Sequence, residues 1–246
     1  MKKISRLSPP DCFDNNISKD EKIEYYQNTG KSKTINPRWN NICKDTDGIS
    51  LVRKKLLEMS DNVCAFCGVR VFNESFDVEH FLPKDEFPYL AYCFENYLPC
   101  CKTCNQTRKK TFVPDSLKGK EIIEDILQHI FPNAEIYNHA QILQKTKDRI
   151  IEPTFDDIET HLVFNAELLC YDTKTKIGEI TNRIFFDHKE VSEKWENISQ
   201  YIKLIVFKTE NYDELTKAFI LIDGYEYVSL AFLDYWKKEK KAGRTR

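Results

Sequence analysis

Apolar side chains recur at helical spacing along several stretches of this 246-residue chain. Between residues 47 and 61, four of them lie close to one helical face, and Asp47 precedes them as a candidate N-cap. These four are Ile49, Val52, Leu56 and Met59. The same spacing predicts helices over residues 19–27, 121–131, 190–208, 213–222 and 225–241. In the last of these, we expect Tyr227, Leu230, Phe232 and Trp236 to pack inward.

Alternating and turn-forming patterns occupy the middle of the chain. Residues 75–81 alternate as a strand does, residues 160–172 are typical of a hairpin, and residues 105–110 suit a short helix. Residues 62–72 are expected to form strand, tight turn and strand, with Gly68 at the reversal. The expected class is α+β and mainly helical. We divide it into an N-terminal arm and helix (1–60), a compact core (61–115) and a C-terminal helical region (116–246).

Composition limits the possible partners. A formal net charge of −2 gives the chain no overall attraction for nucleic acid, so such binding needs local basic patches or a partner protein. No apolar run approaches the roughly 18 residues of a membrane span. Lys2 and Lys3 are not followed by the apolar segment of a secretion signal, so we expect a cytoplasmic protein without a membrane partner.

Cysteine spacing is the most informative chemical feature of the chain. In a cytosolic protein, paired cysteines indicate metal binding, and two C-x-x-C pairs can close a tetrahedral zinc site. The pairs are Cys64/Cys67 and Cys101/Cys104. Four thiolates leave no position open for water, so the zinc is expected to be structural. Cys100 is an alternative ligand, but its three-residue gap to Cys104 is less usual. We expect free thiols at Cys12, Cys43, Cys93 and Cys170.

The segment between the two cysteine pairs carries candidate catalytic groups. Glu79 and His80 stand next to each other, and Asn96 and Asn105 lie before and after the second pair. An isolated histidine is more often structural than catalytic. Here an imidazole base, an acidic metal ligand and two amides occur together, and these groups are suited to phosphodiester hydrolysis.

This pattern resembles the HNH nucleases, which have the ββα-metal (His-Me finger) fold. The residues that carry it are C-x-x-C, Asp-Val-Glu-His-Phe-Leu-Pro and Asn-x4-Cys-x-x-Cys-Asn-x3-Lys, and the asparagine spacing favours Cys101 over Cys100. The resemblance implies that His80 is the general base and that Asn96 either holds the loop bearing it or orients the base. It implies that Glu79 and Asn105 bind the catalytic ion. Their oxygen ligands favour Mg²⁺ or Mn²⁺.

Basic residues flank this segment and are candidates for gripping substrate phosphates. They are Lys84, Lys102, Arg108, Lys109 and Lys110. Lys109 falls at the lysine position of the motif, which makes it the first choice. The alternative for each is an ordinary solvated surface charge.

Further stretches resemble the PtuB family, the HNH proteins of the Septu anti-phage system. They are the start MKKISRL, the segment EHFLPK and parts of residues 148–189. The resemblance implies a bacterial defence nuclease with a PtuA-like ATPase partner, restrained until infection. For the family members that occur in retron systems, it also implies association with a retron reverse transcriptase and its msDNA. We favour DNA as the substrate, while RNA, including tRNA, stays open.

A second interpretation is a zinc-ribbon adaptor that binds nucleic acid or protein without catalysis. Trp39, Trp195 and Trp236 could anchor a partner or belong to the core. Asp156–Asp157 suggests turn chemistry, with a second acidic metal site as the alternative. The remaining histidines are expected to be structural or surface residues: His129, His139, His161 and His188. The basic tail from Lys237 to Arg246 could bind nucleic acid or be a solvated chain end.

Overall fold

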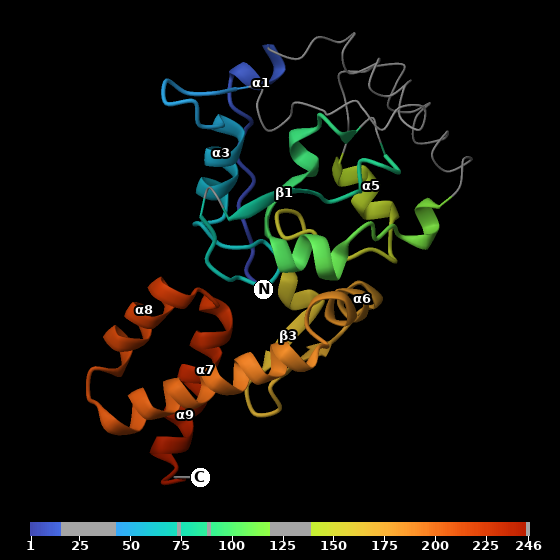
Figure 1. Ribbon diagram of the computed structural model, residues 1–246. Helices are drawn as coiled ribbons and strands as arrows, with labels where there is room; N and C mark the ends of the chain where they lie inside the picture. Colours follow the sequence, from blue (N-terminus) through green and yellow to red (C-terminus); the bar gives the residue numbers. More distant parts are fainter. Residues whose placement is uncertain (16–42, 73–74, 88–89, 119–138, 245–246) are drawn as a thin grey trace.

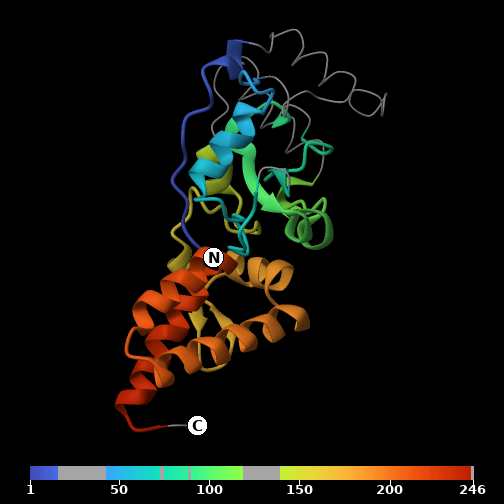
Figure 2. The ribbon, with the colours of Figure 1, turned by 60° about the vertical axis from the view of Figure 1, so that its left-hand side comes forward.

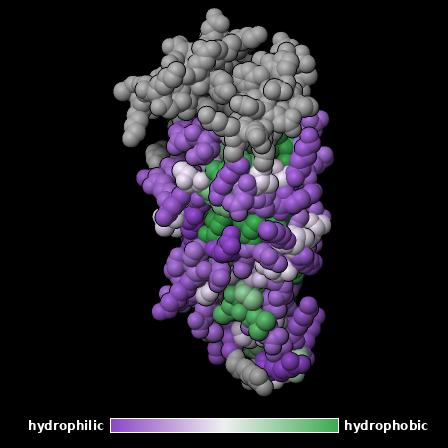
Figure 3. Space-filling view, turned by 90° about the vertical axis from the view of Figure 1, so that its right-hand side faces the viewer, coloured by the Kyte–Doolittle hydropathy of each residue, from purple (hydrophilic) through white to green (hydrophobic). Residues whose placement is uncertain are grey.

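The computed structural model describes residues 1–15, 43–72, 75–87, 90–118 and 139–244. Figures 1 and 2 show an elongated molecule with residues 12–15, residues 51–59 and the small sheet toward one end, the last three helices at the other and the N-terminus between them. The predicted helices at 19–27 and 121–131, together with Trp39 and His129, lie outside the described residues. On the face drawn in Figure 3, most of the surface is hydrophilic and the apolar areas are separate.

In the described part of residues 1–60, the helices are the short α1 (Cys12–Asn15) and the longer α3 (Leu51–Met59), which buries Val52, Leu56, Leu57 and Met59. The expectation that Asp47 caps this helix is wrong. Ser50 is the N-cap, and its side chain accepts a hydrogen bond from the backbone nitrogen of Arg53 at 3.3 Å. The preceding turn is closed instead by Asp45, whose carboxylate accepts from the nitrogens of Asp47 and Ile49.

The small sheet pairs β1 (Phe76–His80) with β2 (Tyr97–Cys101) in antiparallel order. Its register places Phe76 opposite Cys101 and His80 opposite Tyr97. A π-helix, η3 (Thr103–Lys109), follows β2 directly, and the single turns η2 (Phe94–Asn96) and η4 (Asp115–Leu117) flank these elements. The predicted strand at 75–81 is confirmed, and the expected short helix begins slightly earlier than residue 105.

The first cysteine pair lies in a turn rather than between two strands. Val63 and Arg70 form one isolated bridge, and Gly68 donates from its nitrogen to the carbonyl of Cys64 at 2.9 Å. Gly68 has a φ of +79°, which confirms that the reversal uses a conformation that suits glycine. The two strands expected in residues 62–72 do not form, because the cysteine turn takes up the residues between the bridge positions.

The C-terminal half contains the predicted hairpin and helices. The hairpin joins β3 (Leu162–Asn165) to β4 (Cys170–Thr173). The confirmed helices are α7 (Lys189–Lys208), α8 (Tyr212–Asp223) and α9 (Glu226–Lys241). The periodicity did not predict α5 (His139–Lys145), the turn η5 (Ile158–Thr160) or α6 (Lys176–Phe185). These elements are short, and α6 depends on tertiary contact with β4 and η3 for its packing.

Aromatic side chains form the core of this half. Trp195 packs edge-on against Phe164 and Tyr171, and Phe232 is fully buried against Phe164. Trp236 is also buried and donates from its indole nitrogen to the hydroxyl of Ser199 at 3.1 Å. The two described tryptophans are therefore core residues. Leu230 is 42% exposed, so the expectation that it packs inward is wrong.

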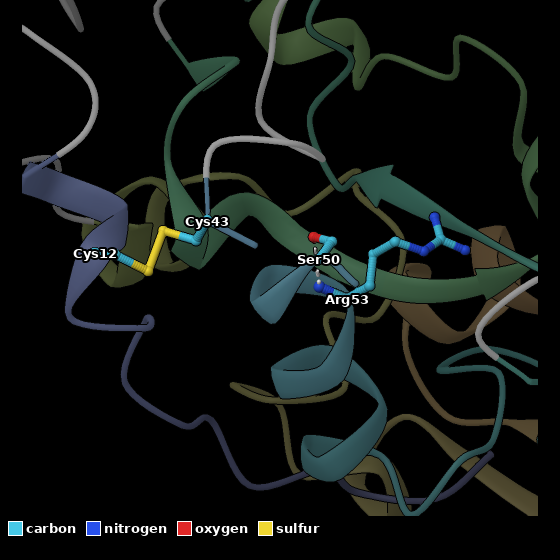
Figure 4. Close-up of a disulfide and its surroundings, with 4 residues drawn as sticks. All are labelled: Cys12, Cys43, Ser50 and Arg53. Carbon is cyan, nitrogen blue, oxygen red and sulfur yellow. Dashed lines mark hydrogen bonds between the residues drawn. A yellow bond between two sulfur atoms is a disulfide. The ribbon is translucent and has the colours of Figure 1, made fainter. Parts of the chain in front are cut away.

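A disulfide joins Cys12 to Cys43, as Figure 4 shows. The expectation of free thiols at these two positions is therefore wrong. They are 31 residues apart in sequence, but the fold brings their Cα atoms to 5.8 Å, a separation that suits a disulfide. Cys93 and Cys170 are free thiols, as expected. Among the described helices, none combines the length and the apolar character that crossing a membrane requires.

Candidate active site and metal centre

The four paired cysteines meet at one point. The sulfur atoms of Cys64, Cys67, Cys101 and Cys104 all lie within 4.8 Å of one another, and those of Cys67 and Cys101 are 3.7 Å apart. Zinc–sulfur bonds of about 2.3 Å in a tetrahedron would separate the sulfurs by about 3.8 Å. The cluster expected from the sequence is confirmed, and its donor set fits a metal ion such as zinc.

Cys100 lies beside this cluster without belonging to it. Its sulfur is 3.9 Å from that of Cys64, and its side chain is fully buried. Burial raises the pKa of the Cys100 thiol well above its usual range. A neutral, packed thiol is the state that this environment favours, in agreement with the choice of Cys101 as the ligand.

His80 ends β1 and is held by a backbone carbonyl. Its Nε2 lies 3.1 Å from the oxygen of Ala91, and the hydroxyl of Tyr97 donates to the same oxygen. The rings of His80 and Tyr97 meet edge-on with centroids 5.0 Å apart. Because a carbonyl only accepts, Nε2 carries the hydrogen and Nδ1 is the basic nitrogen. Burial lowers the pKa of His80 to about 4, so the ring is neutral near pH 7.

Asn96 lies behind His80 and is completely buried. Its Oδ1 accepts from the nitrogen of Leu82 at 2.8 Å, and its Nδ2 donates to the oxygen of the same residue at 3.0 Å. Its backbone oxygen also accepts from the nitrogen of Phe81 at 2.8 Å. These three bonds fix the chain immediately after His80, which is the geometry of a residue that holds a loop.

Glu79 and Lys109 form a buried ion pair. The ammonium of Lys109 donates to Oε1 of Glu79 and, at 3.1 Å, to the backbone oxygen of His80. Burial raises the pKa of Glu79, and the charge of Lys109 acts in the opposite direction. We expected Lys109 to contact phosphate, but its side chain is 0% exposed and faces Glu79 instead. The long side chain of Lys109 extends from η3 to β1 to make these contacts.

Asp77 is a site residue to which sequence reasoning gave no role. Its Oδ2 accepts from Nδ2 of Asn105 at 2.9 Å and from Nε2 of Gln106 at 2.8 Å. The signal that could have identified it is the strand alternation, which places residues 77 and 79 on the same face of β1.

A surface hollow of about 270 Å³ brings three of the four candidate catalytic residues together. Glu79, His80 and Asn105 line it, while Asn96 supports it from behind. The remaining lining residues are Val78, Pro83, Lys84, Asp85, Gln106, Lys110 and Thr111. Thr111 also borders a larger groove of about 710 Å³, which extends to α6 and carries charges of both signs.

The candidate phosphate-binding residues are distributed unevenly. Lys84 and Lys110 line the hollow, and Lys84 also contacts Asp85 at 2.6 Å. Lys102 is exposed but does not line the hollow. Arg108 is largely buried and lies 3.4 Å from Glu190 of α7. Two of the five basic residues are therefore in position to meet a substrate in the hollow.

The acidic pair at 156–157 belongs to a structural network. Asp156 accepts hydrogen bonds from two of the three guanidinium nitrogens of the buried Arg149, one of them at 2.7 Å, and also from the backbone nitrogen of Glu152. The imidazole of His161 is 3.8 Å from Asp156, and that of His139 is 3.9 Å from Glu152. These contacts support the turn interpretation over a second metal site.

Comparison with known proteins gives one similarity. The chain is 48% identical over 132 residues to a protein from Bacillus thuringiensis named Septu protein PtuB. The match covers 52% of this chain and 39% of that relative, so the chain spans well under half of the relative's length. No protein-family model matches the chain, and no solved structure matches it. The similarity supports the resemblance to the PtuB family.

Proposed function

We propose that this protein is a metal-dependent HNH endonuclease that hydrolyses phosphodiester bonds in a Septu-type anti-phage defence system. The observation that carries the proposal is the meeting of Glu79, His80 and Asn105 in one hollow beside the four-cysteine cluster. The similarity to a Septu protein supports the defence role.

His80 is the general base of this proposal. The carbonyl of Ala91 holds its Nε2, so Nδ1 is the nitrogen that accepts a proton from water. Burial keeps the imidazole neutral near pH 7, which is the form a base needs. Tyr97 and Asn96 act indirectly, because one shares the Ala91 carbonyl and the other fixes the chain that follows His80.

Glu79 and Asn105 would hold the divalent ion. A carboxylate and an amide oxygen are hard ligands, which suit Mg²⁺ or Mn²⁺. Lys109 contacts Oε1 of Glu79, so Oε2 is the oxygen for the ion. When bound, such an ion neutralises negative charge on the phosphoryl group and on the leaving oxygen. The four-cysteine cluster would hold structural zinc and fix β2 and η3, from which Asn105 projects.

Lys84 and Lys110 would contact phosphates at the hollow, and the larger groove would take the flanking strand. Neither group of residues distinguishes one sugar from the other, so RNA stays open beside DNA, the substrate that we favour. Because the net charge is −2, tight binding of a polyanion is expected to need a partner, for which we propose a PtuA-like ATPase. In a retron-associated system, the reverse transcriptase and msDNA would join it.

The test compares wild type with His80→Ala, each alone and with the ATPase, on plasmid DNA and total RNA with Mg²⁺ or Mn²⁺. We expect His80→Ala to reduce cleavage by about 10²–10⁴-fold. His188→Ala is the matched control, since His188 lies at the start of α7 and bonds the carbonyl of Ile184. Equal cleavage by His80→Ala and wild type would overturn the base assignment.

The competing function is a non-catalytic zinc-ribbon adaptor. The four-cysteine cluster favours it equally, because such clusters also shape binding surfaces. Binding of nucleic acid or of the ATPase without cleavage under any metal condition would support the adaptor over the nuclease.

A further inference from the structure

The carboxylate of Asp77 connects β1 to η3 through two side-chain amides. One oxygen, Oδ2, accepts from Asn105 at 2.9 Å and from Gln106 at 2.8 Å. Both donors come from consecutive residues of η3, whereas Asp77 lies 28 residues earlier. The register of β1 against β2, and the short step from β2 into η3, bring the three side chains together.

The chemistry of these groups fixes which end of the Asn105 amide faces Asp77. An asparagine side chain has a donor end, Nδ2, and an acceptor end, Oδ1, and the two ends differ little in shape. An ionised carboxylate only accepts, so it selects the nitrogen. The oxygen is then turned away from Asp77, and only the oxygen can bind a hard cation.

The position of Asp77 separates this role from direct contact with the ion. Strand alternation places Asp77 on the same face of β1 as Glu79, but Asp77 does not line the hollow that Glu79 and Asn105 line. Gln106 provides a second donor to the same oxygen and thereby steadies the carboxylate. Asp77 therefore reaches the hollow through Asn105.

We propose that Asp77 is a positioning residue that orients the Asn105 amide so that its oxygen, and not its nitrogen, is presented to the divalent ion. The inference rests on the proposed function, since it assigns a task to the ion site of the nuclease. It adds a residue whose loss changes metal affinity without touching the imidazole base or the thiolate cluster.

The experiment measures Mn²⁺ affinity by calorimetry on the full-length, zinc-loaded protein, with zinc content and melting temperature as checks on the fold. We expect Asp77→Asn to weaken Mn²⁺ binding by about 10–100-fold, the usual effect of losing an outer partner of a metal ligand. Asp172→Asn is the matched control. Asp172 also accepts from an asparagine amide, Nδ2 of Asn165 at 3.2 Å, but it lies in the β3–β4 hairpin and does not line the hollow, so Mn²⁺ affinity should stay within about threefold of wild type.

A second experiment, made in the Asn105→Asp variant, separates the orientation of the residue 105 side chain from the charge of Asp77. In Asn105→Asp both ends of the side chain are oxygen, so orientation no longer matters. Adding Asp77→Asn to Asn105→Asp should then cause no further loss of Mn²⁺ affinity. A further loss in that background would mean that Asp77 attracts the ion by its own charge, and the positioning role would be overturned.

The remaining outcomes are equally decisive. Wild-type affinity in Asp77→Asn would overturn the inference and leave the nuclease proposal intact. Loss of zinc or a lowered melting temperature in Asp77→Asn would assign the residue to the fold and also overturn it. Absence of Mn²⁺ binding by wild type would overturn the proposed ion site together with this inference.

Discussion

The site region (residues 64–111) and the helical unit (residues 189–241) differ in what they bury. The site region encloses Glu79, His80, Asn96 and Lys109 next to a cluster of thiols. The buried polar side chains described in the helical unit are all hydroxyls, at Ser199, Thr216 and Ser229. One region removes charged and titratable groups from water, while the other buries mainly apolar side chains.

This difference sets the position of the candidate catalytic groups and the free energy that their burial takes from folding. Burying charges and amides opposes folding unless every group finds a partner, as Glu79 does in Lys109 and Asn96 does in Leu82. The same burial shifts the pKa values of Glu79 and His80. The site region therefore needs an additional source of stability, which a metal ion bound by the four-cysteine cluster would provide. The helical unit obtains its stability mainly from apolar packing, in which aliphatic side chains such as Ile202 and Val206 join the aromatic ones.

Removing the metal should have the largest effect and should act on one region. Structural zinc contributes on the order of 10 kcal/mol to small domains, so Cys64→Ser should lower zinc content and unfold the site region first. Hydrogen exchange should show lost protection over residues 64–111 and retained protection in α7 and α9. Cys170→Ser, which changes a free thiol outside the cluster, is the control. Simultaneous loss of hydrogen-exchange protection in both regions would show that the site region and the helical unit are not stabilised independently.

Truncating the aromatic core should produce the reverse pattern. Phe232 is fully buried against Phe164, so Phe232→Ala should cost about 3–5 kcal/mol of unfolding free energy, measured by denaturant titration. Zinc content should stay at the wild-type value. Leu230→Ala on the same helix is the matched control, because Leu230 is 42% exposed and should change stability little. Zinc loss in Phe232→Ala would show that the two regions depend on each other.

Breaking the disulfide should have a smaller effect, confined to the N-terminal arm and the site region. For a separation of 31 residues, the chain-entropy estimate is about 3–4 kcal/mol. Phe13, next to Cys12, packs against Phe94 and Tyr97, so Cys12→Ser should loosen the support of His80. Thermal melts of oxidised wild type and Cys12→Ser measure the change, with Cys93→Ser as the control. Equal melting temperatures would refute a stabilising role for the disulfide.

The smallest expected effect is on acid stability. His139 is buried near Arg6, Arg149 and Glu152, and burial lowers its pKa to about 3. Since the unfolded chain binds this proton near pH 6.5, stability should fall as pH drops from about 6.5 toward 3, by up to about 1.4 kcal/mol per unit.

The measurement compares denaturation midpoints at pH 7 and pH 4.5. His139→Gln should lose less stability between these pH values than wild type does. His188→Gln, at the start of α7, should behave as wild type. An equal loss in wild type and His139→Gln would place the acid sensitivity elsewhere.

The sequence by itself determined the elements whose signals are local. Two C-x-x-C spacings identified the thiol cluster, alternation identified β1, and helical periodicity placed α7, α8 and α9 within about one residue of their observed ends. These signals are local because each ligand pair or apolar face is set by residues a few positions apart.

Tertiary structure alone decided the contacts that join distant residues. Three of these contacts each span about 30 residues: the Cys12–Cys43 disulfide, the Lys109–Glu79 pair and the Asp77–Asn105 bond. No rule of residue spacing predicts them. They depend on the register of β1 against β2 and on the direction in which η3 leaves the sheet. A shift of one residue would turn Asp77 and Glu79 to the other face, so the packing that fixes the register also fixes the site.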